Sequence, residues 1–163
     1  MKKLFVLAVT VGLLALSAFA QDSDRGMATL KIKTATLSVN YGRPALAGRD
    51  VEKDLLSRLP VGGEWRMGMN EATTLTTDGD LLIADKRVAA GKYVLVAKRG
   101  EGDKWSLVIK DEQDHVVAET PMKFEKAKDS AERLTITLMD AAGGGKLYLQ
   151  WGTFSLAMQF KKA

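Results

Sequence analysis

The residues best suited to chemistry lie in one short run, WRMGMNEATT, which spans residues 65–74. Within it, Arg66, Asn70 and Glu71 place a guanidinium, an amide and a carboxylate close together. Arginine suits carboxylates and phosphates, asparagine both donates and accepts hydrogen bonds, and glutamate accepts them or acts as a base. Burying such groups without partners costs free energy, so they form either a site or a corner whose members satisfy one another.

A second polar run precedes the first and contains Tyr41, Arg43 and Arg49. Between the two runs, residues 50–59 carry apolar side chains at helical spacing, with an aspartate at the start and a proline after the end. We therefore expect a short helix there, which covers one end of the domain and brings the two runs together. Trp65 and Tyr41 add flat faces for stacking. The predicted binding residues are Tyr41, Arg43, Arg49, Trp65, Arg66, Asn70 and Glu71.

Three functional hypotheses follow from this constellation. The first is a non-catalytic module that binds a small polar or anionic ligand, a glycan or an envelope protein. The second is a hydrolase or lyase in which Glu71 is the general base and Arg66 stabilises an anion. The third is a purely structural envelope protein or assembly module, which associates through edge strands and in which the cluster is a buried lock with Glu71 paired to Arg43 or Arg66. In that lock, Asn70 adopts a positive φ and Gly68 permits the bend.

Elsewhere, apolar and polar side chains alternate with period two, which is typical of strands with one buried face. The clearest runs are residues 37–41, 105–109, 134–138, 147–151 and 154–160. Glycine-rich turns at 100–103 and 142–145 separate several of them, and the last two runs are expected to be a pair of strands. Trp105 and Trp151 fall on inward faces, so we expect them in the core. The pattern predicts a single antiparallel β-sandwich, or a partly closed barrel, with one short helix.

The first 20 residues have the three parts of a secretory signal peptide. Two lysines form a basic start, residues 4–16 are largely apolar, and Ala18-Phe19-Ala20 is a small-x-small cleavage site. The apolar run is shorter than the ~20 residues that cross a bilayer. We predict cleavage after Ala20 and export to the periplasm or beyond. Residues 21–163 then form one domain, for which we predict no transmembrane segment.

Composition excludes several classes of site. The chain has no cysteine and one histidine, His115, which excludes disulfides, thiol nucleophiles, zinc–thiolate centres and a two-histidine metal site within one chain. Loss of the signal lowers the formal charge from +4 to about +2, with both signs interspersed, which disfavours nucleic-acid binding. We predict no cofactor and no metal.

Three weaker candidates have simpler explanations. Asp78-Gly79-Asp80 contains part of a calcium-loop pattern without its full ligand spacing, so a hairpin turn explains it better. His115 follows several acids, but no G-x-S-x-G nucleophile motif accompanies it, so we expect a solvated turn. Met67 and Met69 are possible ligands of a soft metal, yet methionine is a common core filler.

The two polar runs also carry an ordered set of motifs. These are YGRP at 41–44, GR at 48–49, P-x-G-x-x-W-R-x-G-x-N-E-A-T at 60–73 and A-G-x-Y-x-L at 90–95. The set resembles the signature of a bacterial exported family catalogued as a domain of unknown function, number 2911. The resemblance runs from about residue 37 to 95, with a further match at Trp151. It implies an exported all-β domain and no particular reaction. This chain has Met67-Gly68-Met69 where the family usually has Thr-Gly-Ala, which makes any pocket there larger and more apolar.

Overall fold

The computed structural model describes residues 24–163, which form one antiparallel sheet of ten strands with one short helix. The all-β prediction is therefore confirmed, and the sheet is not closed into a barrel. The predicted signal peptide lies outside the described residues. Within residues 24–163, no helix has the length and apolar character needed to cross a membrane.

The elements are β1 (Arg25–Ile32), β2 (Ala35–Gly42), the helix η1 (Glu52–Leu56), β3 (Glu64–Trp65), β4 (Thr73–Thr77), β5 (Leu81–Ile83), β6 (Lys86–Val88), β7 (Gly91–Arg99), β8 (Trp105–Lys110), β9 (Val116–Ala141) and β10 (Gly144–Lys162).

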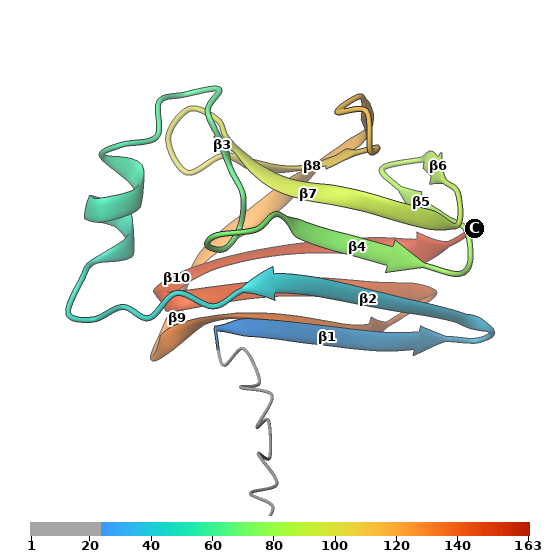
Figure 1. Cartoon of the computed structure of the whole chain (residues 1–163), viewed down its shortest axis with the longest axis horizontal. Helices are drawn as coiled ribbons and strands as arrows, with labels where there is room; N and C mark the ends of the chain where they lie inside the picture. The colour runs from blue at the N-terminus through green and yellow to red at the C-terminus, as the bar shows by residue number, and fades with distance from the viewer. Residues whose placement is uncertain (1–23) are drawn as a thin grey trace, which may run out of the picture.

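The strand order is β1-β2-β4-β7-β8-β9-β10-β5-β6, and the short β3 pairs with β7. β9 pairs with β8 as far as Met122 and with β10 from Lys123 onward. Because its partner changes along its length, β9 carries the chain from one layer of the sandwich to the other. The ribbons of β9 and β10 pass behind β1, β2 and β4 (Figure 1).

β9 and β10 form one long two-stranded ribbon that folds back on itself. Gly144 and Phe160 would lie roughly 50 Å apart in a straight strand. However, a Cβ atom on Gly144 would meet the Phe160 carbonyl oxygen at 2.0 Å. The bend lies at Gly152, where φ is +59° and the pairing register shifts. The two runs predicted as separate strands, 147–151 and 154–160, are therefore one strand, and the bulge between them changes which alternate positions face inward.

An aromatic cluster fills the core on the inner side of this bend. Phe154, only 1% exposed, lies 5.5 Å from Trp105, 5.2 Å from Phe124 and 6.2 Å from Trp65 between ring centroids. Trp105 and Trp151 are both buried, as their positions on inward faces predict. Large aromatic rings bury much apolar area, so this cluster fixes the spacing of the two layers near the bend.

The helix η1 lies at one end of the sandwich, as predicted, but it is shorter than the expected 50–59 (Figure 1). The Asp50 carboxylate accepts a hydrogen bond from the Lys53 N–H at 3.0 Å, and the Asp54 carboxylate accepts the Asp50 N–H at 3.0 Å. This reciprocal cap resembles a capping box, and its Lys53 hydrogen bond lowers the pKa of Asp50 below the usual value. After the helix, Arg99 of β7 binds two carbonyl oxygens and ties the segment to the sheet.

The turn that connects β3 to β4 packs directly on the backbone of β2. A Cβ atom on Gly42 would lie 2.2 Å from the Met69 carbonyl oxygen, and one on Gly68 would lie 2.9 Å from the Gly42 carbonyl oxygen. Both glycines are therefore required by the close approach of two backbones. This contact fixes the position of the WRMGMNEATT run relative to β2.

Candidate functional site

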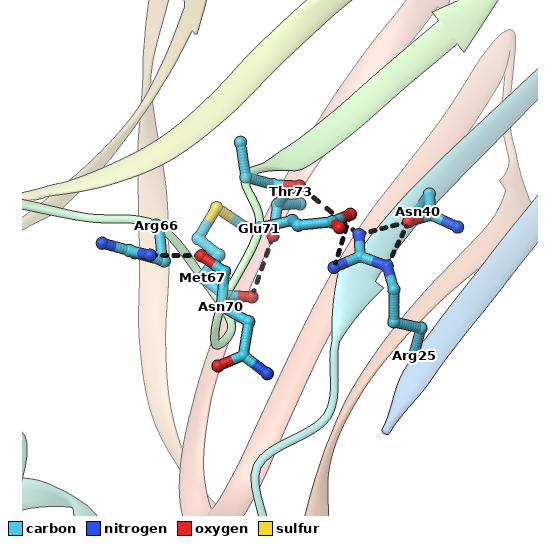
Figure 2. Close-up of polar contacts among 8 residues, drawn as sticks. Arg25, Asn40, Arg66, Met67, Asn70, Glu71 and Thr73 are labelled. Carbon is cyan, nitrogen blue, oxygen red and sulfur yellow. Dashed lines mark hydrogen bonds and ion pairs between the residues drawn. The ribbon is translucent and has the colours of Figure 1, made fainter. Parts of the chain in front are cut away.

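The seven predicted binding residues lie in three separate places. Tyr41 and Arg43 contact β9, whereas Asn70 and Glu71 lie at the end of the turn before β4, with Glu71 near Arg25 of β1. Figure 2 shows the side chains of Arg66 and Glu71 pointing in different directions from the same turn. Three of the seven line one pocket, and these are Arg49, Trp65 and Arg66. The structure therefore divides the predicted constellation into two structural groups and one candidate site.

Tyr41 and Arg43 join β2 to the outer edge of β9. The Tyr41 hydroxyl donates to the Ile136 carbonyl oxygen at 3.2 Å, and Arg43 Nε donates to the Leu134 carbonyl oxygen at 3.3 Å. Both side chains cross Gly26, where a Cβ atom would lie 2.6 Å from the Tyr41 ring. These bonds add to the backbone bridge between Ala45 and Arg133 and tie the end of β2 to β9, so the two residues have a structural role.

Glu71 belongs to a small surface network with β1 and β2. Arg25 Nε donates to Asn40 Oδ1 at 2.8 Å, and Arg25 Nη1 lies 3.7 Å from Glu71 Oε2 (Figure 2). The Glu71 side chain is 81% exposed. The expected pairing of Glu71 with Arg43 or Arg66 is therefore not formed. The reason is that the turn before β4 places the Glu71 side chain beside β1 and β2, where Arg25 is the nearest cation.

The turn itself satisfies its own polar groups. Arg66 Nη1 donates to the Asn70 carbonyl oxygen, and the Thr73 hydroxyl donates to the Met67 carbonyl oxygen at 3.3 Å (Figure 2). Asn70 has a positive φ of 60°, as predicted, and Met67 has one of 55°. Gly68 contributes by fitting against β2 and not by an unusual φ. Among the described residues, the guanidinium of Arg66 is thus anchored through Nη1 alone.

A pocket of about 420 Å³ lies between η1, β3 and the bend of β10. We call it the tryptophan pocket, because Trp65 and Trp151 line it and stack with ring centroids 6.4 Å apart and planes 18° apart. Leu55 and Leu59 from the helical segment and Met69 from the turn add apolar lining. Clefts of this size with aromatic lining and a few polar groups are typical of small-molecule sites.

Three guanidinium groups line the tryptophan pocket. Arg49 donates to two nearby carbonyl oxygens, and its Cζ lies 5.6 Å from the Trp151 ring centroid, which is a cation–π distance. Arg66 is anchored through Nη1 alone. Arg58 is exposed, and its guanidinium has no hydrogen-bond or ion-pair partner within residues 24–163. The pocket therefore presents more N–H donors than the described chain uses.

Two carboxylates also line the pocket, and both are engaged. Glu64 Oε2 accepts from Lys110 Nζ at 2.7 Å, and Asp54 accepts the Asp50 N–H. The hydrogen bond with Glu64 raises the pKa of Lys110 and keeps that ammonium charged. With three arginines and two carboxylates, the lining of the pocket carries one net positive charge.

Sequence reasoning missed part of this site. Arg58 has a readable signal, since it lies within the run predicted as helical and three positions after Leu55, which is the spacing of one helical face. Trp151 was assigned to the core, and it is buried, but the bend of β10 also brings its ring to the pocket. The role of Arg25 as the partner of Glu71 depends on the pairing of β1 with β2, which no local pattern specifies.

The weaker candidates have ordinary partners. Asp80 accepts hydrogen bonds from the Ala90 N–H at 2.9 Å and from Arg87, as a turn residue does. His115 is exposed and pairs with Asp111 in the turn between β8 and β9. In the described part of the chain, no three side chains of the metal-binding types gather closely enough to hold an ion.

Comparison with protein families identifies the family of this chain. The model of a family described as "Protein of unknown function (DUF2911)" matches residues 23–160. The chain belongs to this family. The match covers nearly all of the described fold, which is much more than the motif region at 37–95. Comparisons with curated proteins and with solved structures returned no match.

The exposure of Glu71 generates a stability prediction. Glu71→Gln should lower the free energy of unfolding by less than about 1 kcal/mol, because a solvated ion pair contributes little. Glu64→Gln is the matched control and should cost more, since its partner Lys110 is only 11% exposed. Urea denaturation of both variants measures the difference. A loss of about 3 kcal/mol or more for Glu71→Gln would restore the buried-lock hypothesis.

Proposed function

We propose that this DUF2911 protein is an exported, non-catalytic binding module that holds a small polar or anionic ligand in the tryptophan pocket. The observation that carries the proposal is the combination of a stacked tryptophan pair with guanidinium groups whose donors are partly unused. Contact with the tryptophan rings contributes affinity for the ligand, and hydrogen bonds from the arginines fix its orientation.

Binding is favoured over the hydrolase or lyase hypothesis by the directions of the two residues that the latter requires. Glu71 faces Arg25 over the β1–β2 side of the turn, whereas Arg66 lines the tryptophan pocket (Figure 2). A general base and an anion stabiliser must contact the same substrate. In this arrangement the two side chains do not share a cleft.

Ligand binding is tested by thermal shift with a panel of sugars, phosphates, carboxylates and short peptides. A ligand present at a hundred times its Kd stabilises the folded state by about 2.7 kcal/mol and raises Tm by roughly 5–10 °C. We expect at least one anionic class to do so, and Arg58→Glu to abolish the shift while leaving the Tm without ligand nearly unchanged.

Lys53→Glu is the control for that experiment, because it makes the same charge change five residues away, in the helix η1 and outside the pocket lining. It should keep the ligand-induced shift. If every compound leaves Tm unchanged, or if Arg58→Glu responds to ligand as the wild type does, the proposed function is wrong.

Export is part of the same proposal and rests on the three-part pattern of the first 20 residues. Expression of the full chain in a bacterial host should yield a periplasmic or secreted product that begins at Gln21. Intact-mass spectrometry of that product measures the loss of residues 1–20. A product that begins at Met1 and stays with the cytoplasmic fraction would contradict export.

A further inference from the structure

The charged side chains that line the tryptophan pocket favour a ligand that accepts hydrogen bonds, because three guanidinium groups stand beside two carboxylates. Arg58 has no partner within residues 24–163, and Arg66 uses only Nη1 there. Glu64 Oε2 accepts from Lys110, and Asp54 Oδ2 accepts a backbone N–H. A ligand with more acceptors than donors therefore matches this lining best.

This asymmetry disfavours a neutral sugar. Each sugar hydroxyl is both a donor and an acceptor, and its donor needs a protein acceptor when it is buried. The lining has only two carboxylates to act as acceptors, Asp54 and Glu64, and each already accepts one hydrogen bond. The unused guanidinium groups instead match a group that only accepts, such as an ionised acid.

The same two carboxylates limit the charge that the pocket accepts. Asp54 and Glu64 line the pocket beside the arginines, so a ligand with two negative charges would be repelled by both. A single negative charge gains from Arg58 and Arg66 with less repulsion. A planar carboxylate also matches the fork of a guanidinium group.

The remaining lining determines the body of the ligand. Leu55, Leu59 and Met69 present apolar side chains, and Trp65 with Trp151 presents aromatic ones. Burying an apolar or aromatic group against them gains free energy in proportion to the area removed from water. A small acid without such a body would leave this part of the pocket unfilled.

Resting on the binding function proposed above, we infer that the ligand is an amphipathic monocarboxylate. Its carboxylate binds Arg58 and Arg66, and its apolar or aromatic body lies against the tryptophan pair and the leucines. A hydrophobic amino acid at the C-terminus of a peptide and a free aromatic acid share this chemistry.

The test is NMR titration of the ¹⁵N-labelled protein with a matched pair of probes, N-acetyl-L-phenylalanine and its amide. The acid carries an ionised carboxylate where the amide carries a neutral carboxamide. Phenyl phosphate serves as a third probe, with two negative charges. The indole N–H signals of Trp65 and Trp151 report on the pocket. Trp105 is buried, does not line the pocket, and serves as the internal control.

We expect the acid to shift the signals of Trp65 and Trp151, with the amide and phenyl phosphate binding about tenfold more weakly, the loss expected for one charge-assisted hydrogen bond. Arg58→Ala and Arg66→Ala should each weaken the acid about tenfold and leave the amide unchanged. Lys53→Ala should bind the acid as the wild type does.

The outcomes separate the two proposals. If the acid and the amide bind equally at the tryptophan signals, the pocket binds ligands but the choice of a carboxylate is wrong. Binding of phenyl phosphate as tight as that of the acid overturns the preference for a single charge. If none of the three probes moves the signals of Trp65 and Trp151, the inference is overturned, and the proposed function is then decided by the thermal-shift panel.

Discussion

The rings of Trp65 and Trp151 come from different layers of the sandwich and stack at the end where η1 lies. Trp65 belongs to β3, which pairs with β7, and Trp151 stands at the bend of β10. Trp65 also meets Phe154 edge to face at 6.2 Å, so the stack continues into the aromatic core. The helix, the bend and the turn after β3 all lie around this contact. Without it, the pocket would lose its aromatic lining.

One stretch of sequence serves two purposes at this end. The turn WRMGMNEATT directs Arg66 toward the tryptophan pocket and Glu71 toward Arg25, while its backbone packs on Gly42 of β2. Its internal hydrogen bonds hold this arrangement without help from a ligand. A rigid turn presents a guanidinium at low entropic cost, which is how a preorganised binding group gains affinity.

Much of the fold follows from local pattern. Alternating side chains predict the strands, the glycine-rich runs predict the turns, and the helix with its Asp50 cap is specified within a few residues. The positive φ of Asn70 was likewise predictable from residue type. Each of these depends on neighbours in the chain, which the sequence displays directly.

The rest depends on contacts between distant segments. The bend at Gly152 is indicated only by the change of phase between Trp151 and Phe154, and it joined two runs that looked like separate strands. The pairing of Glu71 with Arg25 and the reach of Tyr41 to β9 depend on strand order, which alternation does not encode. Long-range pairing therefore decided which predicted residues share a site.

The central claim is that the Trp65–Trp151 stack joins the layers and forms the pocket. A double-mutant cycle with Trp65→Leu, Trp151→Leu and the double variant tests it, with urea denaturation as the measurement. The account predicts a coupling free energy of about 1 kcal/mol, since the double variant should lose less than the sum of the single variants. Strictly additive losses, with no coupling beyond error, would contradict the claim.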